Sequence, residues 1–330
     1  MQANIVVVVE KPAALRALAP HLSRRWPGRK IHAVLTNYLG MYEFRYPRGL
    51  SFSAFPWIGE PEWKPRQPDQ WAVWSVTSAG VAKTHDGLLE TLRRADEVIC
   101  ATDPDPSGAA AFHILLSQAL GVLSQALGDE VALVEHGALF LSSLDARHIE
   151  KALNEPSSTA APWFVANLNA GFARRFFDFN FNVNALALFG RVLRQIDPER
   201  SGHVVSKYGV QFLYALADRP VCSEFDALVL MTDWRGTGRY EPAPLGSAAS
   251  RHEIIAGLKR AGLIGSTERG GFAVSDLGHQ FLGLLHPDCR DADLPARLRQ
   301  WQQDWPRSRP AVERYLRTFF GKQKRFMARS

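Results

Sequence analysis

The chain has 330 residues, of which 46% are hydrophobic and 22% are charged, as is ordinary for a soluble globular protein. At about 100–200 residues per domain, this length predicts two or three domains. No apolar run reaches the roughly 18 residues that a membrane-spanning helix needs, so we expect no membrane partner. The three cysteines, Cys100, Cys222 and Cys289, lie far apart and suit neither disulfides nor a Cys-x-x-Cys metal site, which indicates a reducing, cytoplasmic setting.

The net charge of +6 is concentrated at the carboxyl-terminal end of the chain. Residues 297–330 hold ten Lys and Arg side chains against Asp304 and Glu313, with six aromatic residues interleaved. Such a segment attracts phosphates by counterion release and can stack bases on its rings. The alternative is a solvated helix face whose aromatic residues belong to the core, and composition supports the two interpretations equally.

The first part of the chain alternates strand-like and helix-like stretches. Strands are predicted at 4–9, 30–35, 71–76, 97–101 and 131–134, and helices at 12–22, 84–94 and 109–119. The proline-rich residues 55–69 form an excursion outside the core. Strands that alternate with helices indicate an α/β fold, with a parallel sheet covered by helices on both faces, and we assign it to residues 1–150.

The sequence becomes mainly α-helical from about residue 143 onward. Helices are predicted at 144–153, 162–177 and 184–196, the last two in a helical segment that spans 151–240. The region 241–330 contains the basic tail and, before it, the outline of a winged-helix-like unit. That outline consists of a helix, a short strand, a glycine turn, a second strand and a helix, at 251–261, 263–264, 269–271, 272–274 and 275–285.

Three carboxylates follow two of the predicted strands. Glu10 and Lys11 come directly after the first strand, and Asp103 and Asp105 follow the strand at 97–101. Because loops at the carboxyl ends of parallel strands share one crevice, we expect these side chains to converge. Converging carboxylates repel one another unless a divalent cation lies among them, and hard oxygen ligands suit Mg²⁺. Glu10, Asp103 and Asp105 are therefore candidate Mg²⁺ ligands, and a helix N-cap beside an ordinary acidic loop is the alternative.

These motifs resemble those of a known family. A strand that ends in Glu-Lys-Pro, followed by Asp-x-Asp-x-x-Gly after a later strand, is similar to the TOPRIM domain of topoisomerases and primases. Residues 101–108, Ala-Thr-Asp-Pro-Asp-Pro-Ser-Gly, resemble the type IA DNA topoisomerase segment Ala-Thr-Asp-Pro-Asp-Arg-Glu-Gly. Residues 173–178, 206–211 and 246–255 resemble, in the family's order, its segments Ala-Arg-x-x-x-Asp, Ser-x-Gly-Arg-Val-Gln and Gly-Thr-x-Ala-Thr-Arg-x-x-Ile-Ile. The topoisomerase III branch is the nearest match.

The resemblance implies a protein that binds DNA, with single strands preferred. Glu10 and Lys11 are the candidate catalytic residues that it implies. Arg251, at the start of a predicted helix and next to Ser250, can hold a phosphate with help from free backbone N–H groups. A solvated helix face or a helix cap is the alternative for these positions. The candidate DNA-binding residues are Lys11, Arg174, Arg175, Gln211, Ser250 and Arg251.

The departures from the family pattern argue against strand cleavage. Ser107 stands where the family has a third carboxylate, which removes a candidate proton-transfer group. Gly209 stands where the family has arginine. Only about 34 residues separate Gln211 from Gly246, too few for the arch domain that carries the family's Tyr-Pro-Arg-Thr motif.

Tyrosines elsewhere in the chain do not replace that motif. Residues 46–49, Tyr-Pro-Arg-Gly, are similar to it but precede the second acidic motif, and turn formation by proline and glycine explains them. Tyr214 and Tyr240 lie between the two flanking segments but in no such motif.

Three functional hypotheses remain. The favoured one is a topoisomerase-like DNA-binding protein without strand passage, which acts with a protein partner in a DNA-processing complex. The second is an enzyme, either a TOPRIM-type metal-dependent nuclease or a topoisomerase with an unrecognised nucleophile. The third is a non-enzymatic winged-helix interaction module. The first is favoured because the family's order is retained while the arch is missing.

Overall fold

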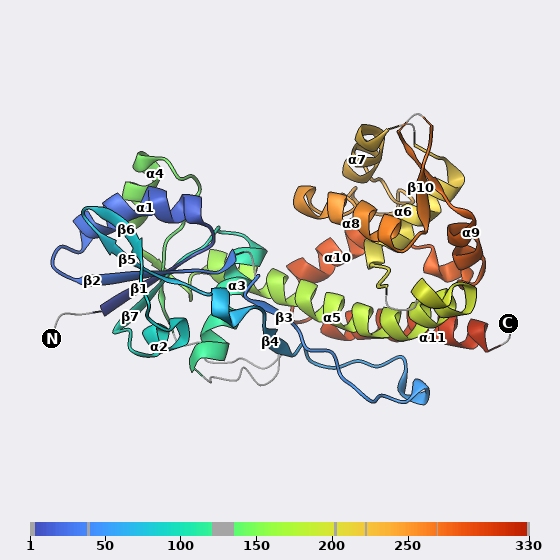
Figure 1. Cartoon of the computed structure of the whole chain (residues 1–330), viewed down its shortest axis with the longest axis horizontal. Coiled ribbons are helices and arrows are strands. Elements are labelled where there is room, and N and C mark those ends of the chain that lie inside the picture. The colour runs from blue at the N-terminus through green and yellow to red at the C-terminus, as the bar shows by residue number, and fades with distance from the viewer. Residues whose placement is uncertain are drawn as a thin grey trace. The chain divides into compact units, whose positions relative to one another are not determined.

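The computed structural model describes residues 4–37, 40–120, 135–200, 203–221, 223–268 and 270–328 (Figure 1). Within these ranges, no helix is long and apolar enough to cross a membrane. The predicted strand at 131–134 and Cys222 lie outside them. Contacts group the chain into two compact units, which differ from the predicted division at residues 150 and 240. Unit 1 is residues 1–45 and 62–172, and unit 2 is residues 46–61 and 173–330.

Unit 1 is built on a seven-stranded sheet in the order β6-β5-β2-β1-β7-β8-β9. The central strands β2, β1, β7 and β8 are parallel, whereas β5, β6 and β9 run antiparallel to their neighbours. The prediction of a parallel sheet is therefore wrong at the edges of the sheet. Only two residues connect β5 to β6, and so short a link gives an antiparallel pair. The strands are β1 (Asn4–Val9), β2 (Lys30–Leu35), β5 (Val73–Thr77), β6 (Gly80–Lys83), β7 (Glu97–Ala101), β8 (Gly137–Ala138) and β9 (Ser157–Ser158).

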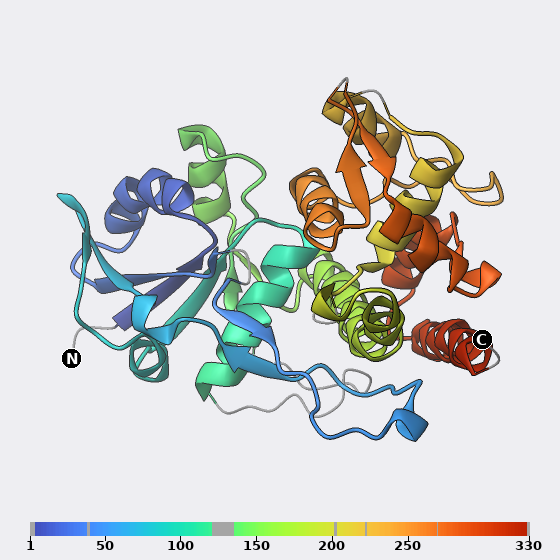
Figure 2. The ribbon, with the colours of Figure 1, turned by 45° about the vertical axis from the view of Figure 1, so that its right-hand side comes forward.

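Helices cover both faces of this sheet (Figure 2). Side chains alternate along a strand, so Val6 and Val8 of β1 pack with α2, α3 and the start of α5, whereas Val7 and Val9 pack with α1 and α4. All four valines are fully buried, as expected for a central strand with helices on either side. The α/β fold with two covered faces is confirmed. The helices are α1 (Pro12–Arg25), α2 (Leu88–Arg93), α3 (Pro106–Leu120), α4 (Ala146–Asn154) and α5 (Pro162–Ile196).

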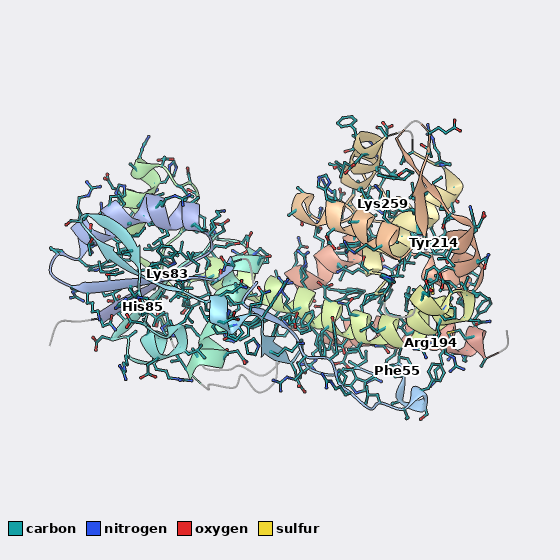
Figure 3. All side chains as sticks on the ribbon, in the orientation of Figure 1. Phe55, Lys83, His85, Arg194, Tyr214 and Lys259 are labelled. Atoms are coloured by element: carbon teal, nitrogen blue, oxygen red, sulfur yellow. The ribbon has the colours of Figure 1, made fainter. Side chains whose placement is uncertain are left out.

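A proline-rich arm, residues 46–61, leaves unit 1 and belongs to unit 2. It connects β3 (Tyr42–Phe44) to β4 (Trp63–Pro65), which pair antiparallel. Asn184 of α5 donates to the carbonyl of Trp57 and accepts from its N–H, at 2.7 and 2.8 Å. Asn180 forms the same pair of bonds with Gly59, at 2.9 and 2.8 Å. Phe55 of the arm and Arg194 of α5 are labelled in Figure 3.

Helix α5 runs without interruption through the gap predicted at residues 178–183. Asparagine usually weakens helices because its side chain competes for nearby backbone groups. Here the side chains of Asn180 and Asn184 donate to the carbonyls of Phe176 and Asn180, one turn earlier, while they also bind the arm. The polar groups that suggested a break are therefore satisfied inside the fold.

The rest of unit 2 is helical, with one small hairpin between α8 and α9. The order helix, strand, strand, helix at 248–283 is as predicted, and its identification as a winged helix stays a prediction. The sequence did not suggest helices α6 and α7. The elements are α6 (Lys207–Asp218), α7 (Glu224–Thr232), α8 (Ala248–Arg260), β10 (Ile264–Ser266), β11 (Phe272–Val274), α9 (Asp276–Gly283), α10 (Leu294–Gln303) and α11 (Arg309–Met327), with short 3-10 turns at Phe52–Ala54, Pro198–Arg200 and Pro287–Cys289. A further 3-10 turn, Pro68–Gln70, belongs to unit 1.

Aromatic side chains of the basic tail form part of the core of unit 2. Helix α11 lies along α5 (Figure 1), and Phe320 packs edge-on to Phe181 with 5.0 Å between ring centroids. Tyr315 lies 5.3 Å from Trp301, and Phe319 lies 4.9 Å from Phe320. These rings are therefore core residues, and not a base-stacking surface.

Candidate nucleic-acid interface and acidic site

The acidic site of unit 1 lies where β1 and β7 end. Glu10 is buried, and its carboxylate accepts a hydrogen bond of 3.1 Å from the backbone N–H of Asp103. Burial, together with the negative charge of Asp103, raises the pKa of Glu10 to about 7. The ammonium group of Lys11 lies 2.7 Å from the Asp103 carboxylate and forms an ion pair with it. The structure thus brings these three predicted residues together.

Asp105 belongs to the same loop but has a structural partner. Its carboxylate accepts a 2.8 Å hydrogen bond from the N–H of Gly108 and so caps the start of α3. A Cβ atom at position 108 would lie 2.2 Å from the Asp103 carbonyl oxygen, so only glycine fits there. The Asp-x-Asp-x-x-Gly spacing is therefore explained locally by a capped helix packed against its own loop.

The three carboxylates have the oxygen chemistry that Mg²⁺ prefers, but two of them have other partners in the structure. Lys11 already neutralises Asp103, and Asp105 is turned toward α3. Within the described ranges, no group of three or more His, Cys, Asp or Glu side chains is placed to hold a metal. Mg²⁺ at Glu10, Asp103 and Asp105 remains a prediction, and we derive no chemical step from it.

A second charged cluster lies on α5, in unit 2. Asp178 forms an ion pair with Lys207, the first residue of α6, and lies 3.8 Å from the Nε atom of Arg174. Burial by itself would raise the pKa of Asp178, but the positive charges of Lys207 and Arg174 outweigh it and lower that pKa. Arg174 is thus partly committed to Asp178, and the adjacent Arg175 is half-buried with its Nε atom enclosed.

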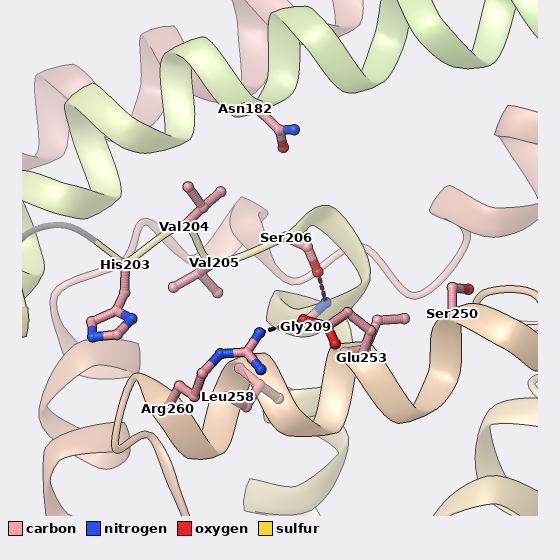
Figure 4. Close-up of a pocket in the computed structure, with 12 residues that line it drawn as sticks. Asn182, His203, Val204, Val205, Ser206, Gly209, Ser250, Glu253, Leu258 and Arg260 are labelled. Atoms are coloured by element: carbon pink, nitrogen blue, oxygen red, sulfur yellow. Dashed lines mark hydrogen bonds and ion pairs between the residues drawn. The ribbon is translucent and has the colours of Figure 1, made fainter. Parts of the chain in front are cut away.

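A pocket of about 410 Å³ lies between α5, the start of α6 and one side of α8 (Figure 4). We call it the α6–α8 pocket. The hydroxyl of Ser206 caps α6 by accepting a 3.0 Å bond from the N–H of Gly209. A Cβ atom at Gly209 would lie 3.1 Å from that hydroxyl and in ordinary contact, at 3.5 Å, with Leu258 of α8. The polar residues that line the pocket are Asn182, His203, Ser206, Ser250, Glu253 and Arg260.

The start of α8 depends on a glycine. Gly246 has a φ of +85°, and a Cβ atom there would lie 2.9 Å from the hydroxyl of Ser250. That hydroxyl donates to the carbonyl of Ser247 at 3.0 Å and faces the pocket. The glycine at the head of the segment 246–255 therefore lets Ser250 take its place in the pocket lining.

An ion pair within α8 lies at the edge of the pocket. Arg260 and Glu253 are seven residues apart, and their side chains meet, although both are more than half exposed (Figure 4). In water such an exposed pair is weak, so a phosphate can compete for the guanidinium group. No pattern in the sequence pointed to Arg260, whereas Ser206 stood in a segment that resembles the type IA family.

The remaining predicted DNA-binding residues, Ser250, Arg251 and Gln211, differ in burial and in hydrogen-bond partners. Ser250 lines the pocket, and the neighbouring Arg251 has a buried Nε atom without a hydrogen-bond partner among the described residues. Gln211 is 2% exposed, donates to the carbonyl of Cys289 and accepts from the N–H of Asp291. This corrects the expectation for Gln211, which supports the 289–291 loop instead of offering a surface for DNA.

The short stretch between Gln211 and Gly246 is packed into unit 2. Trp234 donates to the carbonyl of Ala292 at 2.7 Å, and the N–H of Thr237 donates to Asp293 at 2.7 Å. Burial raises the pKa of Tyr214, which disfavours the ionised form of this phenol. The described part of this stretch consists of the second half of α6, helix α7 and a docked loop.

Tyr46, at the start of the arm, lies beside a residue of the pocket. Its hydroxyl accepts a 3.1 Å hydrogen bond from Asn182, and its ring stacks on Phe179 at 5.8 Å. Gly49, three residues later, has a φ of +72°, which agrees with the turn expected for this motif.

Comparison with known proteins gives a likeness in structure but none in sequence. No protein-family model matches the chain, and no curated protein matches its sequence. Full-length topoisomerase I from Thermotoga maritima is similar in structure, with a TM-score of 0.38 and 16% sequence identity over 65% of this chain. The chain spans 30% of that topoisomerase chain. A likeness of this size carries no conclusion about activity or ligands.

Proposed function

We propose that this chain binds single-stranded DNA at the α6–α8 pocket of unit 2 and does not pass strands. The observation that carries the proposal is the lining of this pocket. The starts of two helices, two serine hydroxyl groups and a guanidinium group lie together there. In this proposal unit 1 is a TOPRIM-type domain with an altered acidic loop, and the α8–α9 region is a winged-helix-like unit.

The pocket has the chemistry of a phosphate site. Ser206 caps the start of α6 and Ser250 lies in the first turn of α8, where helix dipoles favour negative charge. Arg260 brings a guanidinium group to the same pocket, and such groups make strong hydrogen bonds to phosphate. Contacts of this kind position a nucleic-acid backbone without reading its sequence. Binding should therefore be sequence-tolerant and sensitive to salt.

The direct test is fluorescence anisotropy with a labelled oligothymidine strand at low salt. Arg260→Ala should weaken binding about ten- to a hundredfold, because a charge-assisted hydrogen bond contributes about 1.5–3 kcal/mol. Glu253→Gln should strengthen binding, since it releases Arg260 from its ion pair. Arg239→Ala, at an exposed arginine outside the pocket lining, is the matched control and should bind like the unaltered protein. A protein that fails to retain the strand at low salt would contradict the proposal.

One observation favours a second candidate function, strand cleavage by Tyr46. The Tyr46 hydroxyl accepts a hydrogen bond from Asn182, which lines the α6–α8 pocket, so a strand in that pocket would pass near Tyr46. The expected result is nevertheless no cleavage, because the chain between Gln211 and Gly246 holds no arch. Incubation with supercoiled plasmid and Mg²⁺, followed by gels with and without protein removal, separates the two functions. We expect a mobility shift that disappears on protein removal, with plasmid topology unchanged.

Relaxed or nicked plasmid would support the second candidate. Tyr46→Phe keeps the ring that stacks on Phe179 but removes the nucleophile. Loss of relaxation and of covalent protein–DNA adducts in that variant would establish Tyr46 as the nucleophile. Cleavage that persists in Tyr46→Phe would exclude it.

A further inference from the structure

Helix α11 carries a row of three exposed arginines on one side. Arg314 and Arg325 are eleven residues apart, close to three helical turns, so they lie nearly in line, and Arg317 is one turn from Arg314. At about 1.5 Å per residue, the row extends about 16 Å along the helix axis. We call Arg314, Arg317 and Arg325 the α11 arginine row.

These arginines differ from the other described basic residues of the tail, each of which binds a carboxylate or a backbone carbonyl among the described residues. Among the residues that the structure describes, Arg297 pairs with Asp291, Arg307 with Asp304, and Lys322 with Asp288. Arg309 is shared by Glu60 and Glu313, and Arg299 and Lys324 donate to backbone carbonyls. For the three members of the α11 arginine row, no ion pair is formed with any described residue.

The surface between these arginines is a shallow hollow of about 470 Å³. Pro310 and Thr318 complete its lining, together with Glu313, whose carboxylate is held by Arg309 at 3.1 Å. The hollow is therefore bordered by positive charge, and its one carboxylate is already neutralised.

The aromatic residues of α11 face the opposite way. Phe319 and Phe320 pack against Phe181 of α5 and Tyr315 against Trp301 of α10, with 5.0 to 5.8 Å between ring centroids. Single strands are usually held by aromatic rings that stack on unpaired bases, and the α11 arginine row has none. A duplex hides its bases and presents only phosphates along its backbone, so it suits a row of charge without rings.

We propose that the α11 arginine row is a binding surface for the phosphate backbone of duplex DNA. A row of about 16 Å covers several phosphates, which recur about every 3.4 Å of helix axis along each strand. The contact is non-specific in sequence, because guanidinium groups on phosphates read charge and not bases. This surface goes beyond the single-strand pocket and does not depend on it.

The test measures anisotropy of a labelled 25-base-pair duplex and of a single strand over a range of salt concentrations. The triple variant Arg314→Gln, Arg317→Gln, Arg325→Gln should bind the duplex at least tenfold more weakly at low salt. The slope of log K against log salt should become shallower by about 0.9 for each phosphate that is no longer neutralised, so by about 2 to 3. Single-strand affinity should change less than twofold.

Arg307→Gln is the matched control, because Arg307 is highly exposed but lies outside the row and pairs with Asp304. It should leave the duplex slope unchanged. Thermal unfolding should be the same for all variants, because every replaced side chain is exposed.

Three results would overturn the proposal: no duplex binding at low salt, an unchanged salt slope in the triple variant, or equal losses for duplex and single strand. Row-dependent binding to phosphatidylserine vesicles without duplex binding would also overturn it. If the duplex binds through the row while single strands do not bind at all, this proposal stands and the proposed pocket function fails.

Discussion

At the scale of single residues, the clearest signal is the buried carboxyl of Glu10. Its pKa of about 7 stands above the value of 4.5 for a free glutamate, mainly because burial disfavours the charged form. Between about pH 4.5 and 7, the folded protein holds a proton that the unfolded chain releases. The free energy of unfolding should therefore fall as pH rises through this window, by up to about 1.4 kcal/mol per pH unit.

Glu10→Gln should remove this dependence and raise stability above pH 7 relative to the unaltered protein. Urea unfolding at several pH values measures it. Glu155→Gln, at an exposed position, is the control and should follow the unaltered protein. If the free energy of unfolding depends on pH in the same way in Glu10→Gln and in the unaltered protein, the pKa of Glu10 is not raised by folding.

At the scale of elements, the arm and α5 form the most specific contact of unit 2. Asn184 is fully buried, and its amide satisfies both backbone groups of Trp57. Asn184→Ala should reduce the free energy of unfolding by about 2–4 kcal/mol, because two partly buried backbone groups lose their partners and a buried side chain is truncated. The midpoint of urea unfolding measures this loss.

Asn154→Ala replaces an exposed asparagine at the end of α4 and should change stability by no more than about 0.5 kcal/mol. Limited proteolysis gives a second readout for Asn184→Ala, which should speed cleavage within residues 46–61. Equal proteolysis and equal midpoints for the two variants would mean that the asparagine contacts do not hold the arm.

At the scale of the whole molecule, much of unit 1 was predictable because its signals are local. The valine run of β1 alternates between two buried faces, which the structure confirms. The rule that loops at the carboxyl ends of parallel strands converge correctly placed Glu10 next to Asp103. It did not foresee that Lys11 would neutralise Asp103 or that Asp105 would cap α3, because each depends on where one side chain points.

Unit 2 was less predictable, because its decisive contacts join distant segments. Asn180 and Asn184, in the part of α5 where a gap was predicted, bind an arm that lies more than a hundred residues earlier in the chain. The aromatic residues of the tail were equally consistent with a core and with a stacking surface until their packing against α5 was seen. Gln211 matched a motif but lies in the interior, and Arg260 matched none but lines the pocket.

The sequence by itself determined the α/β class, the buried central strand, the acidic loops after β1 and β7, and the lack of room for an arch. These follow from the side-chain period of two, the order of elements and the chain length, which are local properties. Tertiary structure alone decided that α6 and α8 enclose a pocket, that the arm completes unit 2, and that three arginines of α11 remain without acidic partners among the described residues. Those features depend on contacts between residues that are far apart in the sequence, and a local side-chain period does not predict such contacts.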